Sequence, residues 1–270
     1  MTITLTINGV EQILSCEPHE SLRSVLRRAG YFSVRYGSST GETGAAAVLV
    51  DGSLISADVM LGAQADGHDV ETIEGLSTLG QLHPIQKAFI DSGAIQSGYS
   101  TPATILAAKA LIDRNPRPTE DDVRDALSGI LDRETGYLRP VHAVLRAAAV
   151  MRGEEPDDIA ITHLDPLLDG GSDAASADRA RVSEIAPRVV PCSDVPRTRV
   201  VGHAEPKVDA IKLVKGNPAF TDDVDLTGTL IAKVLYSPHA HARITSIDDS
   251  AARSLPGVHA VLHHGNVTQV

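Results

Sequence analysis

The chain has 270 residues, of which 42% are hydrophobic and 22% charged, a composition typical of a globular protein with room for two or more domains. Only 3% are aromatic and none is Trp, which disfavours stacked-base recognition and aromatic ligand cages. The formal net charge of −11 disfavours a nucleic acid partner, because phosphate binding needs clustered positive charge.

The N-terminus, MTITLTINGVEQ, has no basic segment followed by an apolar one, and no apolar run of the chain is long enough to span a bilayer. We therefore expect a cytoplasmic protein without membrane contact. Cys16 and Cys192 are the only cysteines, and they are too few and too distant for a disulfide framework or a four-thiolate metal site.

Residues 1–77 show the pattern of a compact α+β domain. Apolar residues alternate on both sides of Asn8-Gly9, which predicts a hairpin because both turn residues tolerate positive φ. The apolar residues that follow are spaced as in a helix, which predicts a helix over 19–29 that ends at Gly30. Strands are expected over 47–50 and 70–73.

Residues 78–152 predict a small helical domain with short connections. Thr101-Pro102 opens one helix, and Thr119, followed by three acidic residues, is a typical N-cap. The four expected helices lie over 82–92, 101–111, 119–127 and 138–150.

Residues 153–197 are rich in Asp, Ala, Ser and Pro, which predicts a linker. Residues 198–270 regain an ordered pattern. Short apolar runs there predict strands over 230–235, 244–247 and 258–262.

The loop Gly37-Ser-Ser-Thr-Gly-Glu-Thr-Gly-Ala-Ala-Ala-Val-Leu-Val-Asp-Gly52 resembles the first cluster loop of the xanthine dehydrogenase/aldehyde oxidase-type molybdenum hydroxylases. The family pattern is roughly G-C-x-x-G-x-C-G-x-C-T-V-x-x-D-G, with a fourth cysteine in a later S-C-L. Val70-Glu-Thr-Ile-Glu-Gly-Leu76 also resembles the family's usual V-x-T-I-E-G-L. The four cysteine positions of this first site fall at Ser38, Thr43, Ala46 and Ala57.

The second cluster domain is matched by three further segments. His83-Pro-Ile-Gln-Lys-Ala-Phe89, Gly93-Ala-Ile-Gln-Ser-Gly-Tyr-Ser-Thr-Pro102 and Ala126-Leu-Ser-Gly-Ile-Leu-Asp-Arg-Glu-Thr-Gly-Tyr137 are similar to H-P-x-Q-x-A-F, G-x-x-Q-C-G-F-C-T-P and A-L-x-G-N-L-C-R-C-T-G-Y. The cysteine positions of this second site fall at Ser97, Ser100, Asp132 and Glu134.

Gly202 to Asp225, Ser237-Pro-His-Ala-His-Ala-Arg243 and Leu255-Pro-Gly-Val258 resemble the opening of the family's a/b hammerhead domain. The resemblance thus implies four parts. These are a degenerate 2Fe–2S ferredoxin-like domain of β-grasp fold over 1–77, a degenerate 2Fe–2S-binding-like helical domain over 78–152, a linker over 153–197, and a partial hammerhead domain over 198–270. Within the family, the likeness is greatest to a cysteine-poor branch connected with hypoxanthine oxidation and selenate reductase.

The substitutions predict that both 2Fe–2S clusters are absent, because a cluster normally needs four thiolates. Hydroxyls are poor ligands, and alanine has no donor atom. The second site keeps an all-oxygen set, for which a hard cation such as Mg²⁺ or Ca²⁺ is an alternative. The competing interpretation is that these side chains cap helices or face solvent.

The best functional residue that the resemblance supplies is Gln96. In the family, the matching Gln lies against the pterin of the molybdenum cofactor, with the backbone at Ser97 and Gly98 beside it. The alternative is a Gln that caps a helix end. Molybdopterin would be bound only together with the large portion of the enzyme that this chain does not contain.

Three functions follow from the resemblance. The leading one is the N-terminal, cluster-free scaffold of a molybdenum hydroxylase, catalytically inactive on its own, whose partners are a molybdopterin-binding subunit or domain and FAD or another redox subunit. The second is a non-catalytic assembly module. The third is an electron-transfer subunit with clusters on unorthodox ligands. A hydrolase is a minor alternative, because Gly37-Ser-Ser-Thr-Gly41 fits G-x-S-x-G but precedes a strand rather than a helix.

Overall fold

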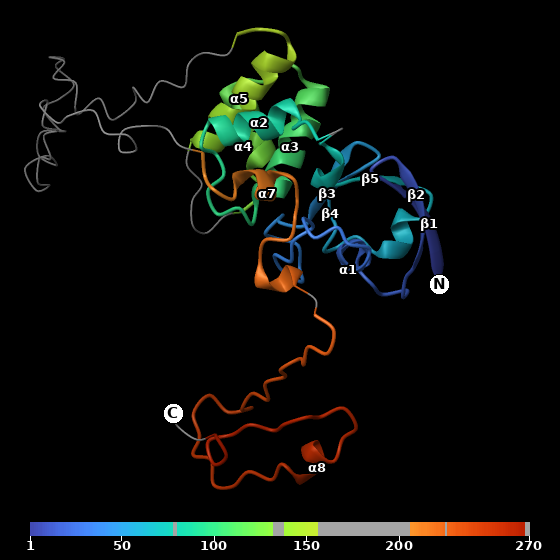
Figure 1. Cartoon of the computed structure of the whole chain (residues 1–270), viewed down its shortest axis with the longest axis vertical. Coiled ribbons are helices and arrows are strands. Elements are labelled where there is room, and N and C mark those ends of the chain that lie inside the picture. The colour runs from blue at the N-terminus through green and yellow to red at the C-terminus, as the bar shows by residue number, and fades with distance from the viewer. Residues whose placement is uncertain (78–79, 132–137, 156–205, 225, 268–270) are drawn as a thin grey trace, which may run out of the picture. The chain divides into compact units, whose positions relative to one another are not determined.

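The computed structural model describes residues 1–77, 80–131, 138–155, 206–224 and 226–267 (Figure 1). The chain divides into two compact units, Met1–Val224 and Asp225–Val270. The first unit combines a sheet with helices, which confirms the expected α+β class. The predicted linker, from residue 156 to its end, lies outside the described residues, as does Cys192.

The chain begins with the predicted hairpin. Strands β1 (Thr2–Ile7) and β2 (Val10–Ser15) pair antiparallel, with Ile7 opposite Val10. Asn8 and Gly9 have φ of 52° and 78°, the positive values that a two-residue turn between twisted strands requires. The local turn chemistry therefore sets the register of the first two strands.

The sheet has five strands in the order β2-β1-β5-β3-β4. Strands β3 (Ala47–Val50) and β4 (Ser53–Ser56) form a second hairpin, and β5 (Asp69–Glu71) lies parallel to β1 and antiparallel to β3. The strand predicted over 70–73 ends early. The Asn8 side chain accepts the backbone N–H of Thr72 at 2.8 Å, and the chain turns into the 3₁₀ helix η2 (Ile73–Gly75).

Helix α1 (Leu22–Arg28) covers one face of the sheet, and Ser21 caps its first turn. Alternate residues of the strands point toward this helix, because side chains of a strand alternate between its two faces. The residues of this core that are 0% or 1% exposed include Ile3, Leu5, Ile7, Leu22, Val25, Leu26, Val48 and Val70.

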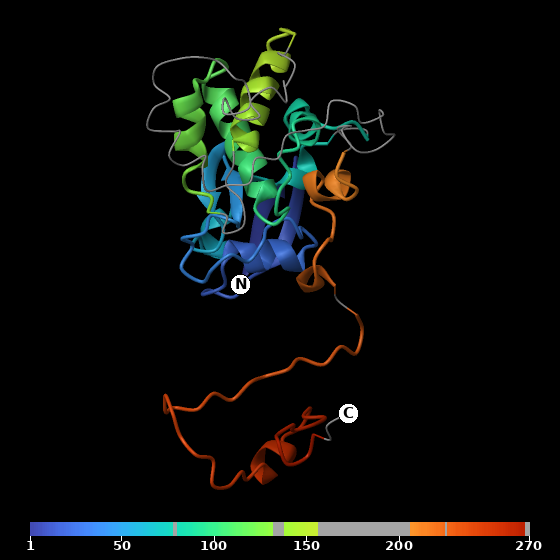
Figure 2. The same cartoon turned by 90° about the vertical axis from the view of Figure 1, so that its left-hand side faces the viewer.

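Four helices follow and confirm the helical pattern: α2 (Pro84–Asp91), α3 (Thr101–Arg114), α4 (Glu120–Leu127) and α5 (Arg139–Met151). Thr119 caps the first turn of α4, as its sequence predicts, and Asp122 completes a capping box. Leu49 of β3 belongs to the same apolar core as these helices. In Figures 1 and 2 the helices gather on one side of the sheet within the first unit.

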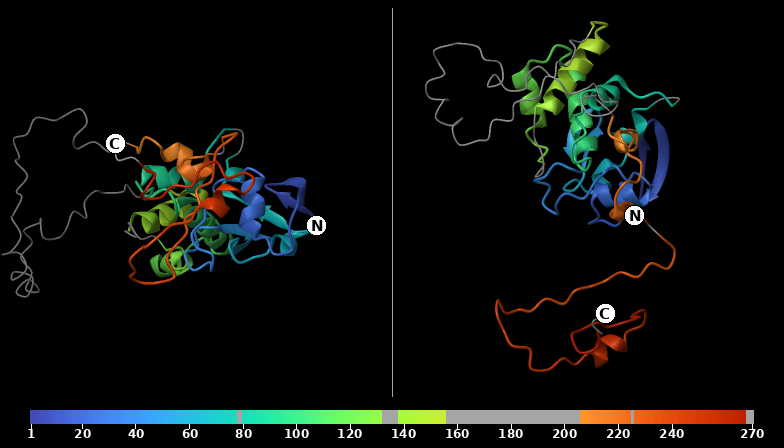
Figure 3. Two further views of the ribbon diagram at one scale, coloured as in Figure 1. Left: turned by 90° about the horizontal axis from the view of Figure 1, so that it is seen from below. Right: turned by 60° about the vertical axis from the view of Figure 1, so that its left-hand side comes forward.

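After residue 205 the chain adds helix α7 (Ala210–Val214) to the first unit, an element that the sequence did not predict. We call residues 207–224 the return segment. It packs against α2 and α3, and in Figures 1 and 2 and the right-hand view of Figure 3 it runs from these helices toward α1.

The second unit has helix α8 (Ser250–Arg253), and its residues 226–267 contain no strand. The strands predicted over 230–235, 244–247 and 258–262 are therefore wrong. A strand is stable only when its backbone hydrogen-bonds to a neighbour. The apolar residues of these runs remain largely exposed instead, for example 63% for Leu230 and 98% for Leu235.

No helix built from the described residues is both long and apolar enough to cross a membrane.

Candidate functional site

The first candidate loop, Gly37–Gly44, runs between α1 and β3. Ser38 shapes it: its hydroxyl accepts the Gly41 backbone N–H at 2.8 Å and donates to Glu42 at 2.9 Å. The Thr43 hydroxyl is buried without a hydrogen-bond partner among the described residues. Strand β3, not a helix, follows this loop, so Ser38 lacks the surroundings of a hydrolase nucleophile.

Two of the four positions of the first site are brought together. The Ala57 backbone N–H donates to the Ala46 carbonyl at 3.0 Å, and both methyl side chains are fully buried. Neither offers a donor atom, and the hydroxyls at the other two positions are poor ligands for iron. These side chains do not fit a cluster held by four thiolates.

A buried carboxylate that sequence reasoning missed lies next to this loop. Asp58 has a side chain only 1% exposed and lies 2.6 Å from the Nε of Arg23. Burial raises the pKa of Asp58, and the Arg23 guanidinium and the backbone amides of Ser38 and Gly37 offset this only in part. Arg23 also stacks over the ring of Tyr36 at 4.7 Å. The backbone amides of the first loop therefore face a carboxylate that is itself paired with an arginine.

The first loop contacts the loop that follows α4. Leu131 donates its backbone N–H to the Thr43 carbonyl at 2.9 Å. A Cβ at Gly44 would lie 2.2 Å from the carbonyl oxygen of Gly129, so only glycine permits this approach. Two stretches of chain that the sequence separates by about 85 residues thus meet backbone to backbone.

At the second site the structure brings Ser97 and Ser100 together, with their hydroxyl oxygens 3.4 Å apart. Ser97 also accepts the Tyr99 backbone N–H at 3.2 Å. Asp132 and Glu134 lie outside the described residues. Among those described, no group of three or more His, Cys, Asp or Glu side chains could hold a metal ion.

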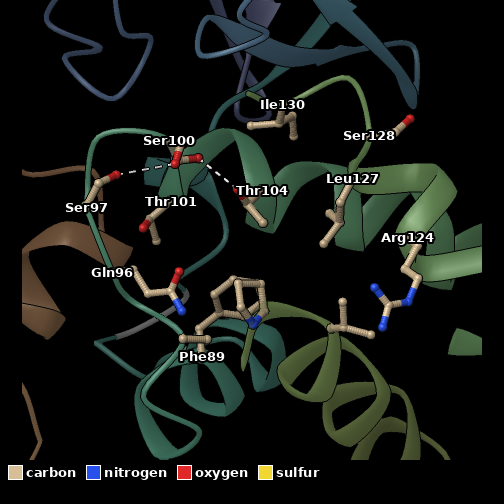
Figure 4. Close-up of a pocket in the computed structure, with 13 residues that line it drawn as sticks. Phe89, Gln96, Ser97, Ser100, Thr101, Thr104, Arg124, Leu127, Ser128 and Ile130 are labelled. Carbon is tan, nitrogen blue, oxygen red and sulfur yellow. Dashed lines mark hydrogen bonds between the residues drawn. The ribbon is translucent and has the colours of Figure 1, made fainter. Parts of the chain in front are cut away.

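These serines border a cavity of about 280 Å³ at the ends of α2, α3 and α4. Gln96 is half-buried and its amide points into the cavity (Figure 4). Within the described part of the chain this amide makes no hydrogen bond, so it does not cap a helix there. The polar groups that line the cavity come from Gln96, Ser97, Ser100, Thr101, Thr104, Arg124 and Ser128.

The residues after Gln96 are fixed by contacts on both sides. Gly98 has φ of 75°, and a Cβ there would lie 2.7 Å from Leu213 of the return segment. The Tyr99 hydroxyl donates to the Tyr36 carbonyl at 2.5 Å, and its ring meets that of Phe220 edge to face. The predicted pterin loop is therefore held between Tyr36, which directly precedes the first loop, and the return segment.

Two family models match this chain. Residues 72–145 match the 2Fe-2S binding domain, and residues 215–270 match the aldehyde oxidase and xanthine dehydrogenase a/b hammerhead domain. These matches define the class of protein to which both units of the chain are similar.

Individual relatives indicate the same class of protein as the two family models. The probable hypoxanthine oxidase XdhD of Escherichia coli K12 is 32% identical over 274 residues, which cover 100% of this chain and 25% of XdhD. The aldehyde oxidoreductase structure from Desulfovibrio desulfuricans has a TM-score of 0.78 and 33% identity, and covers 99% of this chain and 27% of its own. The chain thus spans about a quarter of these relatives, and it belongs to the xanthine dehydrogenase/aldehyde oxidase family of molybdenum hydroxylases.

The comparisons correct the prediction that 2Fe–2S clusters are absent. A 2Fe-2S binding domain matches residues 72–145. The nicotinate dehydrogenase small FeS subunit of Eubacterium barkeri is 42% identical over 149 residues, which are 55% of this chain and 94% of that subunit. These findings point to 2Fe–2S clusters. The prediction was wrong because it weighed ligand atoms alone, whereas the loops and helices around them keep the pattern of iron–sulfur domains.

Proposed function

We propose that this chain is the N-terminal scaffold of a xanthine dehydrogenase/aldehyde oxidase-type molybdenum hydroxylase and binds the molybdopterin-binding portion through the Gln96 loop. The observation that carries this proposal is the Gln96 amide, which points into the cavity and makes no hydrogen bond with the described residues. Such an amide can both donate and accept toward a pterin edge. Gly98 and Ser97 would present their backbone beside it.

The proposal includes the layout of domains. Residues 1–77 form a mixed sheet in which β5 is parallel to β1 and antiparallel to β3, which supports a β-grasp fold, and residues 78–152 would form the helical domain. The linker over 153–197 would join them to a partial hammerhead domain over 198–270. Catalysis itself would be carried out by the molybdopterin-binding portion, and a purine such as hypoxanthine is the substrate class suggested by the likeness to XdhD.

The test is co-purification of the tagged chain with the molybdopterin-binding portion of the same enzyme. We expect a stable complex, and Gln96→Leu to weaken it about tenfold, the value of roughly one polar contact. Gln12→Leu is the matched control, because Gln12 is also half-buried but lies on β2. Absence of any complex would refute the scaffold, and equal binding by both variants would remove Gln96 from the contact.

Electron transfer through 2Fe–2S clusters is a second candidate, which the match of residues 72–145 favours. Iron and acid-labile sulfide analysis of anaerobically reconstituted protein, with visible absorption, tests this function directly. Stoichiometric iron with cluster absorption bands would support electron transfer. A third candidate, a non-catalytic assembly module, predicts that the complex forms but has no hydroxylase activity.

A further inference from the structure

The return segment is packed into the first unit as a core element. Ala210, Leu213 and Val214 are 0% or 1% exposed and join the apolar core of α2 and α3. Gln86 of α2, itself fully buried, donates its amide to the Val214 carbonyl at 2.7 Å. A buried amide of this kind selects a backbone that arrives at one position and one orientation.

The far end of the segment is held by charge. The Asp223 carboxylate is fully buried and pairs with Arg35, whose side chain is 1% exposed. It also accepts the backbone N–H groups of Ala219 and Phe220 at 2.9 and 3.1 Å, and Arg27 lies 3.1 Å away. Residues 1–155 thus present two arginines to the acidic end of the segment, Asp222-Asp223.

The return segment and residues 1–155 are also complementary in shape. The Arg35 guanidinium lies 4.5 Å from the Phe220 ring, on the favourable face for a cation. Gly216 has φ of 74°, and a Cβ there would come within 2.9 Å of atoms of Ile73, Glu74 and Ser33. Side chains of the sheet domain and backbone of the return segment therefore interlock where no larger residue could be placed.

We propose that residues 1–155 carry a peptide-docking groove and that its occupant is the return segment, recognised by the pattern Leu-Val-x-Gly-x₃-Phe-x₂-Asp over residues 213–223. The groove is defined by Arg27, Arg35, Gln86, Gly98 and Tyr99. Every recognition contact described above is non-covalent, so docking does not require the connection through residues 156–205. A segment of this pattern on a separate chain would fit the groove equally well.

The size of the relatives supports separability. The small FeS subunit of Eubacterium barkeri is covered to 94% by a match of 149 residues, so it is too short to hold counterparts of everything from residue 1 to residue 224. A chain of that length can carry the groove or the segment in full, but not both with the intervening connection. In the present protein the connection then serves to keep the segment at high local concentration.

The test uses the full chain with a protease site, flanked by Gly-Ser spacers, inserted between residues 155 and 206. The purified protein is cut completely, as checked on a denaturing gel, and then analysed by native mass spectrometry and sedimentation at falling concentration. We expect the two pieces to remain one complex. Separation of the pieces in the parent protein would overturn the proposal.

Two carboxylates provide a matched comparison. Asp223→Asn should weaken the cut complex on the order of thirtyfold, because it leaves Arg35 buried without its charge partner. Asp222→Asn should change it less than about threefold, because the Asp222 side chain is 68% exposed. Equal affinity of the two variants would remove the ion pair from recognition.

A second variant keeps the proposal testable if Asp223→Asn fails to fold. Phe220→Leu keeps every charge and should weaken the cut complex roughly tenfold through lost ring contacts. Circular dichroism before cleavage establishes that each variant is folded. In the uncut chain, hydrogen exchange of residues 210–216 should rise in Asp223→Asn and stay unchanged in Asp222→Asn. Unchanged exchange in both would contradict docking through Asp223.

Discussion

The two compact units differ in the burial of their apolar side chains. In the first unit, Ile3, Leu5 and Ile7 alternate along β1 and are at most 1% exposed. In the second, Leu230 and Leu235 come from a similar apolar run, but none of the apolar residues described there is buried. A stretch of about 45 residues is close to the lower limit at which a chain buries a core unaided. Apolar pattern predicts burial only when the same unit supplies the opposing surface.

The largest expected effect tests this difference in burial with one leucine from each unit. Leu106→Ala removes a side chain that is 1% exposed in α3 and should lower the free energy of unfolding by about 3 kcal/mol. Leu235→Ala removes one that is 98% exposed and should change it by less than about 0.5 kcal/mol. Urea denaturation followed by circular dichroism measures both. Similar losses would show that the second unit has a core of its own.

The next effect concerns pH and belongs to the first unit alone. Burial works to raise the pKa of Asp223, but the N–H groups of Ala219 and Phe220 and the Arg35 guanidinium outweigh it and lower the pKa from 3.8 to about 2. A lowered carboxyl pKa gives stability that is present above the unfolded value and is lost as pH falls through the folded value. We therefore expect a loss of about 2 kcal/mol between pH 4 and pH 2.

Acid titration of the urea midpoint checks this, with Asp223→Asn as the variant that lacks the titrating group. The slope of stability against pH in this window should be shallower in the variant than in the parent. An identical slope in both proteins would exclude Asp223 as its source.

The smallest effect compares two helix starts. Thr119 accepts the Asp122 backbone N–H at 3.2 Å, and Thr119→Ala should cost about 1 kcal/mol. Asp249 precedes α8 without a side-chain cap and forms only partly exposed ion pairs with Arg253 and His263, so Asp249→Ala should cost less than about 0.5 kcal/mol. Thermal melts of the two variants measure the difference. A reversed order would mean that α8 is the better anchored helix.

The elements that the sequence predicted well are those specified by neighbouring residues. Asn8-Gly9 defines its hairpin because both residues adopt positive φ, and Thr119 defines the start of α4 by capping it. The strands over 230–235 and 244–247 failed for the opposite reason. Alternation is a local signal, whereas a strand needs a partner that no local pattern provides.

The candidate site was predictable only in its outline. The loops around Ser38 and Gln96 were found because their motifs are continuous in sequence. The ion pair of Arg35 and Asp223 was missed because it joins residues 188 positions apart, without any signal that links them. Asp58 was missed for a related reason, since an acidic residue after a strand normally predicts solvent exposure.

The strand order has a consequence for how the protein is made. Because β5 lies between β1 and β3, the two hairpins of the sheet do not pair with each other directly. During synthesis both hairpins leave the ribosome before residues 69–71 do, and the gap between them stays open until those three residues emerge. The sheet is therefore completed at its centre and not at its edge, and no nascent chain can contain it before residue 71 has left the exit tunnel.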